Sequence, residues 1–391
     1  MILTNKQEQG LKEAVTRYTI GDRYIVVSGY AGSGKSTLVS FIIDALKVPL
    51  DEVVYAAYTG KAAQVLVKKG NKNAITLHKL LYESYPMSDG SFMRVAKKNL
   101  NPYKVVVVDE VSMVPLEMIQ LLAKYKVFLI FLGDPGQLPP IDKNTDNHLL
   151  DHPHVFLDEI MRQAQESEII RLTMAIREGK PIQEYHGKEV QIFNKQDYDM
   201  SMLPWADQVI CATNTKRAEL NNKMREMAGK SGEPQNGDKV LCLRNYWDIL
   251  DRGENPLVNG SIGYLINPYG TFIQYPYSLG GGMYKITHTD FESDSHELYS
   301  GLNLDTHMIE TGEKCCSPQT VYKINQNKKW SKSLPLEFTY GYAITCHKSQ
   351  GSSWPNVLVI EENFPFGREE HARWLYTACT RPEQKLVLIK K

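Results

Sequence analysis

Short apolar runs, each ending in small or polar residues, recur along the chain and predict the strands of a parallel sheet. The first run, RYIVVSG, ends at Gly29 and precedes KSTLVSFIIDALK, in which apolar residues recur at helical spacing. The later runs are VVYAA, KVVVV, VFLIF and QVICA, and they lead into YTGKAA, DEVSM, LGDPGQLPP and TNTKR. Because ligands of an open parallel sheet bind at the carboxyl ends of its strands, these clusters predict a binding site along that edge.

The second half of the chain has a different texture. VLVIEE and KLVLIKK flank the helix-like stretch EEHARWLYTACTR, which predicts a further β-α-β unit. From about Pro234 to Pro335, Gly, Asn, Pro and Tyr are frequent between short alternating runs, namely KVLCLRN, IGYLI, MYKITH and TVYKIN. We expect a small all-β insertion there, of the barrel type.

The composition indicates an ordinary protein of the cell interior. The chain has 391 residues, which predicts two to three domains, and 42% hydrophobic and 23% charged residues. No apolar run approaches a membrane span, and the N-terminus has neither a basic head nor an apolar signal core, so we expect a cytoplasmic protein without a membrane partner. The six scattered cysteines indicate free thiols rather than a zinc site or a disulfide framework.

Charge is distributed unevenly although the formal net charge is zero. The stretch from Val53 to Tyr82 has five lysines and no acid, and the stretch from Lys323 to Lys348 has five lysines against one Glu. The second stretch also contains Trp330, Tyr340 and Tyr342. Two interpretations stay open: ordinary solvated faces, or a basic groove with aromatic rings on which nucleic-acid bases stack.

The stretch GYAGSGKS carries the clearest chemistry. It matches G-x-x-x-x-G-K-[ST] through Gly29, Gly34, Lys35 and Ser36. A tight turn before an ordinary helix is the alternative. The strand before the motif and the helix after it favour a phosphate-binding loop, whose backbone N–H groups hold phosphate oxygens.

The polar clusters after the later strands supply candidates for hydrolysis. Asp109 and Glu110 follow four valines, where the first carboxylate can support Mg²⁺ and the second can accept a proton from water. Gln137 can orient the attacking water or sense the γ-phosphate through its amide, although an ordinary loop residue is the alternative. Arg162 and Arg381 can offset charge on the phosphoryl group, although surface ion pairs are the alternative for each.

Taken in order, these clusters resemble the motifs of superfamily 1 helicases. The matching stretches are Gln7, GYAGSGKS, YTGKAA, TLHKLL, DEVSM, GDPGQLPP, LDEIMRQ, FTYGYAITCHKSQGSSW and LYTACTR. The ending Gln-Leu-Pro-Pro is similar to the RecD, Pif1 and Dda group, which moves 5′ to 3′, and the compact length looks most like a phage Dda-type helicase. The resemblance runs from Leu3 to Arg381 except in the β-rich insertion, where only VNG matches.

The resemblance implies an α/β fold with two RecA-like P-loop domains, each with a parallel sheet. It places the first domain at 1–150 and the second at 151–234 with 335–391, and it makes 235–334 a small SH3-like insertion domain. A β-hairpin pin is expected at about 82–99, where Asp89 and Gly90 stand between alternating residues in a pattern typical of hairpins.

The resemblance also assigns roles to residues. Those expected to bind ATP are Gln7 (at the adenine edge), Gly32, Ser33, Gly34, Lys35, Ser36 and Thr37. Ser36 and Asp109 are expected to hold Mg²⁺, and the expected catalytic residues are Lys35, Glu110, Gln137, Arg162 and Arg381. The expected DNA contacts are Thr59, Lys61, His78, Thr213, Asn214, Asn259, His347 and Lys348, with Phe92 as the wedge of the pin.

The function expected from the sequence is therefore an ATP-dependent DNA helicase that moves 5′ to 3′ along single-stranded DNA and opens a duplex fork. Its cofactors are ATP and Mg²⁺, and single-strand-binding or replication proteins are candidate partners of a monomer in a bacterial or phage-infected cell. Two alternatives stay open: a nucleic-acid-dependent ATPase switch without processive unwinding, and a P-loop kinase. RNA also stays open as the track.

Overall fold

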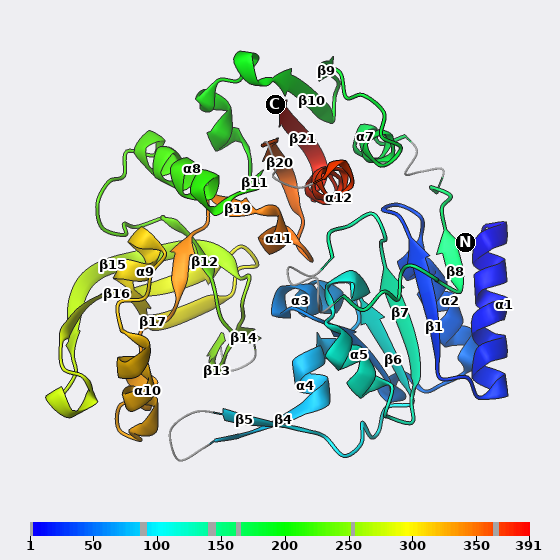
Figure 1. The fold of residues 1–391 in the computed structure, drawn as a ribbon, viewed down its shortest axis with the longest axis horizontal. Helices are drawn as coiled ribbons and strands as arrows, with labels where there is room; N and C mark the ends of the chain where they lie inside the picture. The colour runs from blue at the N-terminus through cyan, green and yellow to red at the C-terminus, as the bar shows by residue number, and fades with distance from the viewer. Residues whose placement is uncertain (1–2, 87–91, 140–145, 162–165, 252–254, 363–366) are drawn as a thin grey trace. The chain divides into compact units, whose positions relative to one another are not determined.

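The computed structural model describes residues 3–86, 92–139, 146–161, 166–251, 255–362 and 367–391, drawn in Figure 1. The chain forms two compact units. The first comprises 1–81, 97–213 and 345–391, and the second comprises 82–96 and 214–344. The helices of the first unit are α1 (Asn5–Ile20), α2 (Lys35–Leu46), α3 (Gly60–Lys68), α4 (Leu77–Leu81), α5 (Leu116–Leu122), α7 (Glu168–Arg177), α11 (Cys346–Ser349) and α12 (Arg368–Cys379). None of the described helices is long and apolar enough to cross a membrane.

A six-stranded parallel sheet forms the first half of this unit. Its spatial order is β3-β2-β6-β7-β1-β8. The strands are β1 (Tyr24–Gly29), β2 (Val53–Ala57), β3 (Ile75–Thr76), β6 (Val105–Asp109), β7 (Phe128–Gly133) and β8 (Val155–Leu157). The four apolar runs VVYAA, KVVVV, VFLIF and RYIVVSG thus lie in adjacent strands, so the polar residues that follow them share one edge of the sheet, as predicted.

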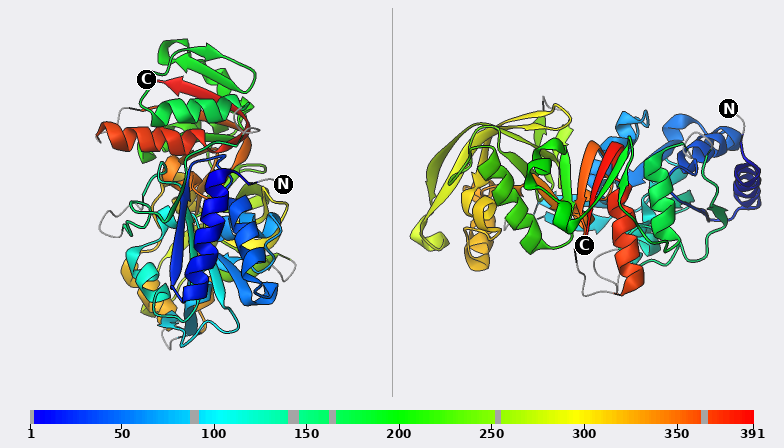
Figure 2. Two further views of the ribbon diagram at one scale, coloured as in Figure 1. Left: turned by 90° about the vertical axis from the view of Figure 1, so that its right-hand side faces the viewer. Right: turned by 90° about the horizontal axis from the view of Figure 1, so that it is seen from above.

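The core beneath the glycine loop explains why its flanking elements form. Ile25 and Val27 of β1 pack with Leu38, Ile42 and other apolar residues of α2 in one buried cluster. Helix α1 packs against α2, β1 and β8, as Figures 1 and 2 show. Its N-terminus is closed by a reciprocal capping box between Thr4 and Gln7. Burial of this cluster holds the phosphate-loop motif between a fixed strand and a fixed helix.

A second sheet belongs to the same unit. Within that unit its strands follow the order β11-β20-β21-β10-β9. They are β9 (Tyr185–His186), β10 (Val190–Asn194), β11 (Gln208–Cys211), β20 (Trp354–Ile360) and β21 (Pro382–Lys390), and all pairs except β9–β10 are parallel. The unit β20-α12-β21 confirms the predicted β-α-β arrangement, and the two sheets confirm the α/β fold class.

The second compact unit is built on an antiparallel sheet in the order β17-β16-β15-β12-β18. Its elements are α8 (Asn214–Met227), α9 (Thr306–Thr311), α10 (Pro318–Gln326), β12 (Lys239–Cys242), β13 (Tyr246–Asp251), β14 (Asn255–Leu257), β15 (Ile262–Gln274), β16 (Met283–Ser293), β17 (Leu298–Asp305) and β18 (Phe338–Tyr340). The chain passes between the two units at β19 (Ala343–Thr345). The predicted hairpin is present as β4 (Tyr82–Pro86) paired with β5 (Phe92–Ala96), and its turn, 87–91, lies outside the described residues.

The prediction of an all-β insertion is wrong in one respect, because α9 and α10 lie within it. The run TVYKIN, interpreted as an alternating strand, lies in α10. Ser317 accepts a hydrogen bond from the Thr320 amide as the N-cap, Pro318 occupies the first turn, and Ile324 is buried. Capping at Ser317 therefore outweighed the alternating pattern of TVYKIN.

Stacking on bases was one of two open interpretations for the aromatic residues near Lys323–Lys348, all of which lie in the second unit. Tyr340 is buried in the core of the second unit, with the Arg225 guanidinium 4.3 Å from its ring centroid. The hydroxyl of Tyr342 donates to Asp238. Trp330 packs edge-on against Tyr275. Tyr340 is thus a core residue, and the stacking interpretation does not apply to it.

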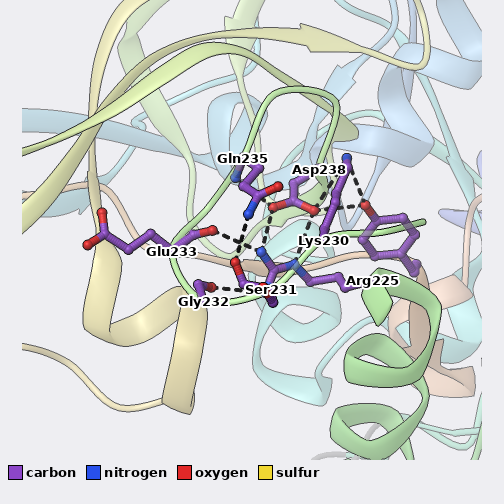
Figure 3. Close-up of polar contacts among 8 residues, drawn as sticks. Arg225, Lys230, Ser231, Gly232, Glu233, Gln235 and Asp238 are labelled. Carbon is purple, nitrogen blue, oxygen red and sulfur yellow. Dashed lines mark hydrogen bonds and ion pairs between the residues drawn. The ribbon is translucent and has the colours of Figure 1, made fainter. Parts of the chain in front are cut away.

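A buried charged network joins α8 to the loop before β12 in the second unit (Figure 3). Asp238 is fully buried and accepts hydrogen bonds from Arg225 Nε at 3.1 Å and Nη2 at 3.0 Å. Arg225 also donates to the backbone carbonyl oxygens of Gly232 and Glu233, and the Gln235 amide donates to Asp238. The network fixes the loop through its backbone.

His154 gives the first unit a pH-dependent contact. Its Nδ1 accepts a hydrogen bond from the Val26 amide of β1 at 2.9 Å, and this contact requires a neutral ring. Burial lowers the pKa of His154, Arg17 lowers it further, and Glu13 and Asp22 oppose the shift. Since the folded-state pKa lies below the unfolded value, this stabilisation is present above about pH 6.5 and is lost as pH falls.

We expect His154→Asn, whose amide oxygen replaces Nδ1 as a neutral acceptor, to flatten the pH dependence of stability. The urea midpoint of the wild-type chain should fall more between pH 7.5 and pH 5.5 than that of the variant. Equal shifts in the two proteins would show that His154 does not contribute this dependence.

Candidate active site

The phosphate loop joins β1 to α2, and its glycines are required by space and by backbone conformation. Gly34 caps α2 with φ +79°, in the left-handed region. A Cβ at Gly34 would lie 2.5 Å from Gln7 Nε2, and one at Gly29 would lie 2.6 Å from Ser33 Oγ and 2.8 Å from the Leu157 carbonyl oxygen. The loop therefore keeps its shape only with glycine at these two positions.

Lys35 and Gln7 both contact this loop. Lys35 Nζ donates to the carbonyl oxygens of Gly29 at 2.6 Å and Tyr30 at 3.1 Å. Gln7 is buried, and its Nε2 donates to the Gly34 carbonyl oxygen at 3.3 Å. The structure thus brings Gln7 to the phosphate loop although 27 residues separate it from Gly34 in sequence. Its contact with the adenine edge stays a prediction.

Several buried polar atoms in and near this loop lack a hydrogen-bond partner among the described residues. They are Ser28 Oγ at the end of β1, Ser33 Oγ in the loop, Ser112 Oγ after the acidic pair, and Gln137 Oε1. A buried polar group without a partner costs about 1–3 kcal/mol. Phosphate oxygens, a hydrated metal ion and an attacking water would supply partners, so the residues present fit a magnesium nucleotide.

The acidic pair stands where β6 ends. Glu110 adopts φ +51° and ψ +46°, a left-handed conformation that costs a non-glycine residue about 1–2 kcal/mol. Its amide donates to Asp109 Oδ1 at 2.9 Å. Burial and the neighbouring Glu110 carboxylate raise the pKa of Asp109 to about 6, while Lys35 and the hydrogen bond oppose the shift. Such an acid beside the phosphate-loop lysine suits a site that receives a divalent cation.

The two predicted arginines differ in what the structure records. Arg162 lies outside the described residues. Arg381 is buried, and its guanidinium donates to the carbonyl oxygens of Thr377 at 3.0 Å and Ser352 at 3.3 Å, and to Thr380 Oγ1 at 2.9 Å. In this conformation Arg381 is bound by its own β-α-β unit, and its contact with the γ-phosphate stays a prediction.

Arg177, at the end of α7, was not found by sequence reasoning. Its guanidinium carbon lies 3.7 Å from the centroid of the Tyr30 ring in the phosphate loop. No motif quoted from the sequence includes Arg177, and a stacked arginine has no spacing signature that would have revealed it.

Comparison with known proteins places the chain in a family. Residues 3–197 match the model of an AAA domain, and residues 340–389 match a UvrD-like helicase C-terminal domain. The ATP-dependent RecD2 DNA helicase of Deinococcus radiodurans is 25% identical over 97% of this chain and 49% of its own length. The Dda helicase of phage T4 is 26% identical over 46% of this chain and 43% of its own. The chain belongs to the superfamily 1 helicases, in the RecD, Pif1 and Dda group.

A solved structure supports the same fold. Pif1 helicase from Bacteroides, in complex with ADP-AlF3 and ssDNA, superposes with a TM-score of 0.53 and 17% identity, covering 99% of this chain and 92% of that one. This likeness establishes the fold. The chain spans about half the length of RecD2.

The residues expected to contact DNA in this helicase are divided between the two units. Thr59, Lys61, His78, Thr213, His347 and Lys348 lie in the first unit, and Phe92, Asn214 and Asn259 lie in the second. Thr59 caps α3, its hydroxyl accepting from the Ala62 amide at 3.2 Å. A Cβ at Gly351, just after α11, would lie 3.5 Å from Thr59 Oγ1, so the chain that leaves α11 passes close to Thr59. The side chain of Phe92 is not among those described.

Two of these residues have a local environment that bears on how they would bind DNA. Burial lowers the pKa of His347, so its ring is neutral at pH 7 and can act as a hydrogen-bonding group but not as a cation. Thr213 donates to Glu362 through its hydroxyl at 2.8 Å and its amide at 3.1 Å. A DNA phosphate at Thr213 would therefore have to displace the Glu362 carboxylate.

Proposed function

We propose that this chain is an ATP-dependent DNA helicase that translocates 5′ to 3′ along single-stranded DNA and opens duplex DNA. The observation that carries the proposal is the set Lys35, Asp109, Glu110 and Gln137 along one edge of a RecA-like sheet, in a chain with a second RecA-like sheet. The 5′-to-3′ direction follows from membership of the RecD, Pif1 and Dda group. The domain boundaries expected from the sequence are part of the proposal.

Hydrolysis would proceed at the edge formed by β1, β6 and β7. The N–H groups of the phosphate loop and the Lys35 ammonium neutralise the β- and γ-phosphates. Ser36 and Asp109 would hold Mg²⁺, which would supply further positive charge at the phosphate oxygens. Gln137 orients a water molecule, and the Glu110 carboxylate accepts its proton as the water oxygen attacks the γ-phosphorus. The bond from the γ-phosphorus to the β,γ-bridging oxygen breaks, and ADP and phosphate leave. Arg162 and Arg381 are proposed to stabilise the charge that develops on the phosphoryl group.

Residues of each unit are proposed to contact single-stranded DNA. The proposed contacts are hydroxyl and amide groups, which accept or donate to phosphate and sugar, together with Lys61 and Lys348, which neutralise phosphates. Contacts to phosphate and sugar do not depend on the base sequence of the strand, as a translocase requires. Single-strand-binding or replication proteins are the partners proposed for a monomeric enzyme of the cytoplasm.

The experiment that tests this function compares two duplexes that differ only in carrying a 5′ or a 3′ single-stranded tail. With ATP and Mg²⁺, we expect unwinding of the 5′-tailed duplex alone and faster ATP hydrolysis when single-stranded DNA is added. Unwinding only from the 3′ tail would contradict the assigned direction.

Two other outcomes would support the alternative functions. DNA-stimulated hydrolysis without unwinding would favour an ATPase switch. Transfer of the γ-phosphate to an acceptor other than water would favour a kinase.

A further inference from the structure

Tyr376 of helix α12, which packs beside the second sheet, contacts both the phosphate loop and the segment after β7. The Tyr376 hydroxyl donates to Asp134 Oδ2 at 2.7 Å and accepts from the Ala31 amide at 3.1 Å. All of these residues belong to the first compact unit. One hydroxyl group therefore links the phosphate loop, the residue that follows β7, and α12.

The same helix fixes the chain on both sides of Gln137. On one side, the Gly136 amide donates to Asp134 Oδ1 at 2.9 Å, while Tyr376 holds the other oxygen of that carboxylate. On the other side, the Leu138 amide donates to Thr377 Oγ1 at 2.9 Å. Gln350, just after α11, donates to the Leu138 carbonyl oxygen at 2.9 Å. The two residues that flank Gln137, Gly136 and Leu138, are thus both held in place from the side of the second sheet. Gly136 is held through Asp134 and Tyr376, and Leu138 is held by Thr377 and Gln350.

Packing leaves little freedom in this arrangement. Tyr376 and Asp134 are each about 2% exposed. A Cβ at Gly136 would lie 2.9 Å from Tyr376 Cε1, so the tyrosine ring packs directly on the backbone beside Gln137. Burial raises the pKa of Asp134, whereas Lys35 and the Tyr376 hydrogen bond favour its charged form. Without that hydroxyl, the buried carboxylate would lose a partner that water cannot easily replace.

Gln137 itself is placed to receive a ligand. Its side chain is buried, and its Oε1 has no hydrogen-bond partner among the described residues. The chemistry proposed for Gln137 requires such an acceptor to be aimed at the attacking water. Its aim depends on the backbone of Gly136 and Leu138, which the second sheet holds.

We infer that Tyr376 is a positioning residue for ATP hydrolysis, which acts by holding Asp134 and, through it, the backbone that aims the Gln137 amide. The inference rests on the proposed function. It explains how the position of α12 in the second RecA-like sheet sets the hydrolytic competence of residues in the first. A displacement of Gln137 by about 1 Å is enough to cost up to a hundred-fold in rate.

Tyr376→Phe removes the hydroxyl and keeps the ring. We expect kcat for ATP, measured with saturating single-stranded DNA, to fall about ten-fold or more, while KM for ATP changes by less than about three-fold. The matched control is Tyr125→Phe. Tyr125 is also buried in this unit and donates to a backbone carbonyl oxygen, that of Lys97, at 2.7 Å. The control should lower the unfolding midpoint to a similar extent and leave kcat within two-fold of the wild type.

A double variant separates positioning from a general structural effect. If Tyr376 acts through Gln137, adding Tyr376→Phe to Gln137→Ala should lower kcat by less than about two-fold. Independent losses that multiply would overturn the inference, as would a kcat for Tyr376→Phe equal to that of Tyr125→Phe. Absence of DNA-stimulated hydrolysis in the wild-type chain would instead reject the proposed function itself.

Discussion

Lys35→Ala should lower the rate of ATP hydrolysis with saturating single-stranded DNA by about a hundred- to a thousand-fold, the loss typical of removing one group that stabilises transition-state charge. The Lys35 ammonium already donates to two carbonyl oxygens of the phosphate loop, so its Nζ lies where the β- and γ-phosphates are expected. Affinity for single-stranded DNA should stay within about three-fold of the wild type, because phosphate contacts of DNA depend on other residues. Hydrolysis is measured by phosphate release and DNA binding by fluorescence anisotropy.

Lys47→Ala is the matched control, because Lys47 is exposed at the other end of the same helix and its loss changes the net charge equally. It should leave hydrolysis within two-fold of the wild type. Turnover of the Lys35 variant within ten-fold of the wild type would refute the assignment of the phosphate loop. Loss of both activities together with a lower unfolding midpoint would indicate a folding defect, and Lys35→Met would then repeat the test.

Asp238→Ala should destabilise the second compact unit by about 3–5 kcal/mol, because it leaves the Arg225 guanidinium buried without its counter-charge. Asp238 is fully buried and accepts hydrogen bonds from Arg225 through both carboxylate oxygens (Figure 3). Its Oδ1 also accepts from the Tyr342 hydroxyl at 2.9 Å. Hydrogen exchange of the full chain, followed by mass spectrometry, should show faster exchange in peptides from 214–344 than in the wild type.

Two further variants show whether the buried charge is the cause. Glu233→Ala removes an exposed carboxylate of the same loop, one that pairs with Lys285. The loss of this exposed pair should destabilise the unit by less than about 1 kcal/mol. Replacing both charges, in Arg225→Met with Asp238→Leu, should recover part of the lost protection, since the buried Arg225 guanidinium is then absent, although Lys230 still loses its ion pair with Asp238. Equal exchange in the Asp238 and Glu233 variants would contradict the expected cost.

Much of the fold was predictable because strand and helix periodicities are local properties of the chain. The apolar runs around Tyr24–Gly29 and Val105–Asp109 are too short and too uniformly apolar for surface helices. The glycine loop between β1 and α2 has a sequence motif that is specific to phosphate-binding loops. The β-rich insertion was less predictable. There, the run that was interpreted as a strand forms α10, which Ser317 caps. The burial of Tyr340 beneath Arg225 could not be predicted from charge and aromatic content.

The candidate site was predictable for the residues that motifs specify, and less so for the residues that hold them. Lys35, Asp109, Glu110 and Gln137 stand in short patterns whose chemistry explains their residue types. Tyr376 and Asp134 also lie within recognised stretches, LYTACTR and GDPGQLPP, yet nothing in their spacing indicates that they meet. They are 242 residues apart in sequence and are joined by a hydrogen bond of 2.7 Å.

By itself, the sequence determined the class of the fold, the order of the strands along the chain and the phosphate loop, and it supplied the groups that are proposed to hydrolyse ATP. Each of these depends on neighbouring residues, through periodicity, capping or the steric freedom of glycine. Only the tertiary structure decided which distant residues meet: Gln7 at Gly34, Arg177 over Tyr30, Arg225 with Asp238, and α12 on both sides of Gln137. The physical reason is that such contacts form between elements that packing brings together. The residues next to a side chain in sequence do not specify which distant residue it will contact.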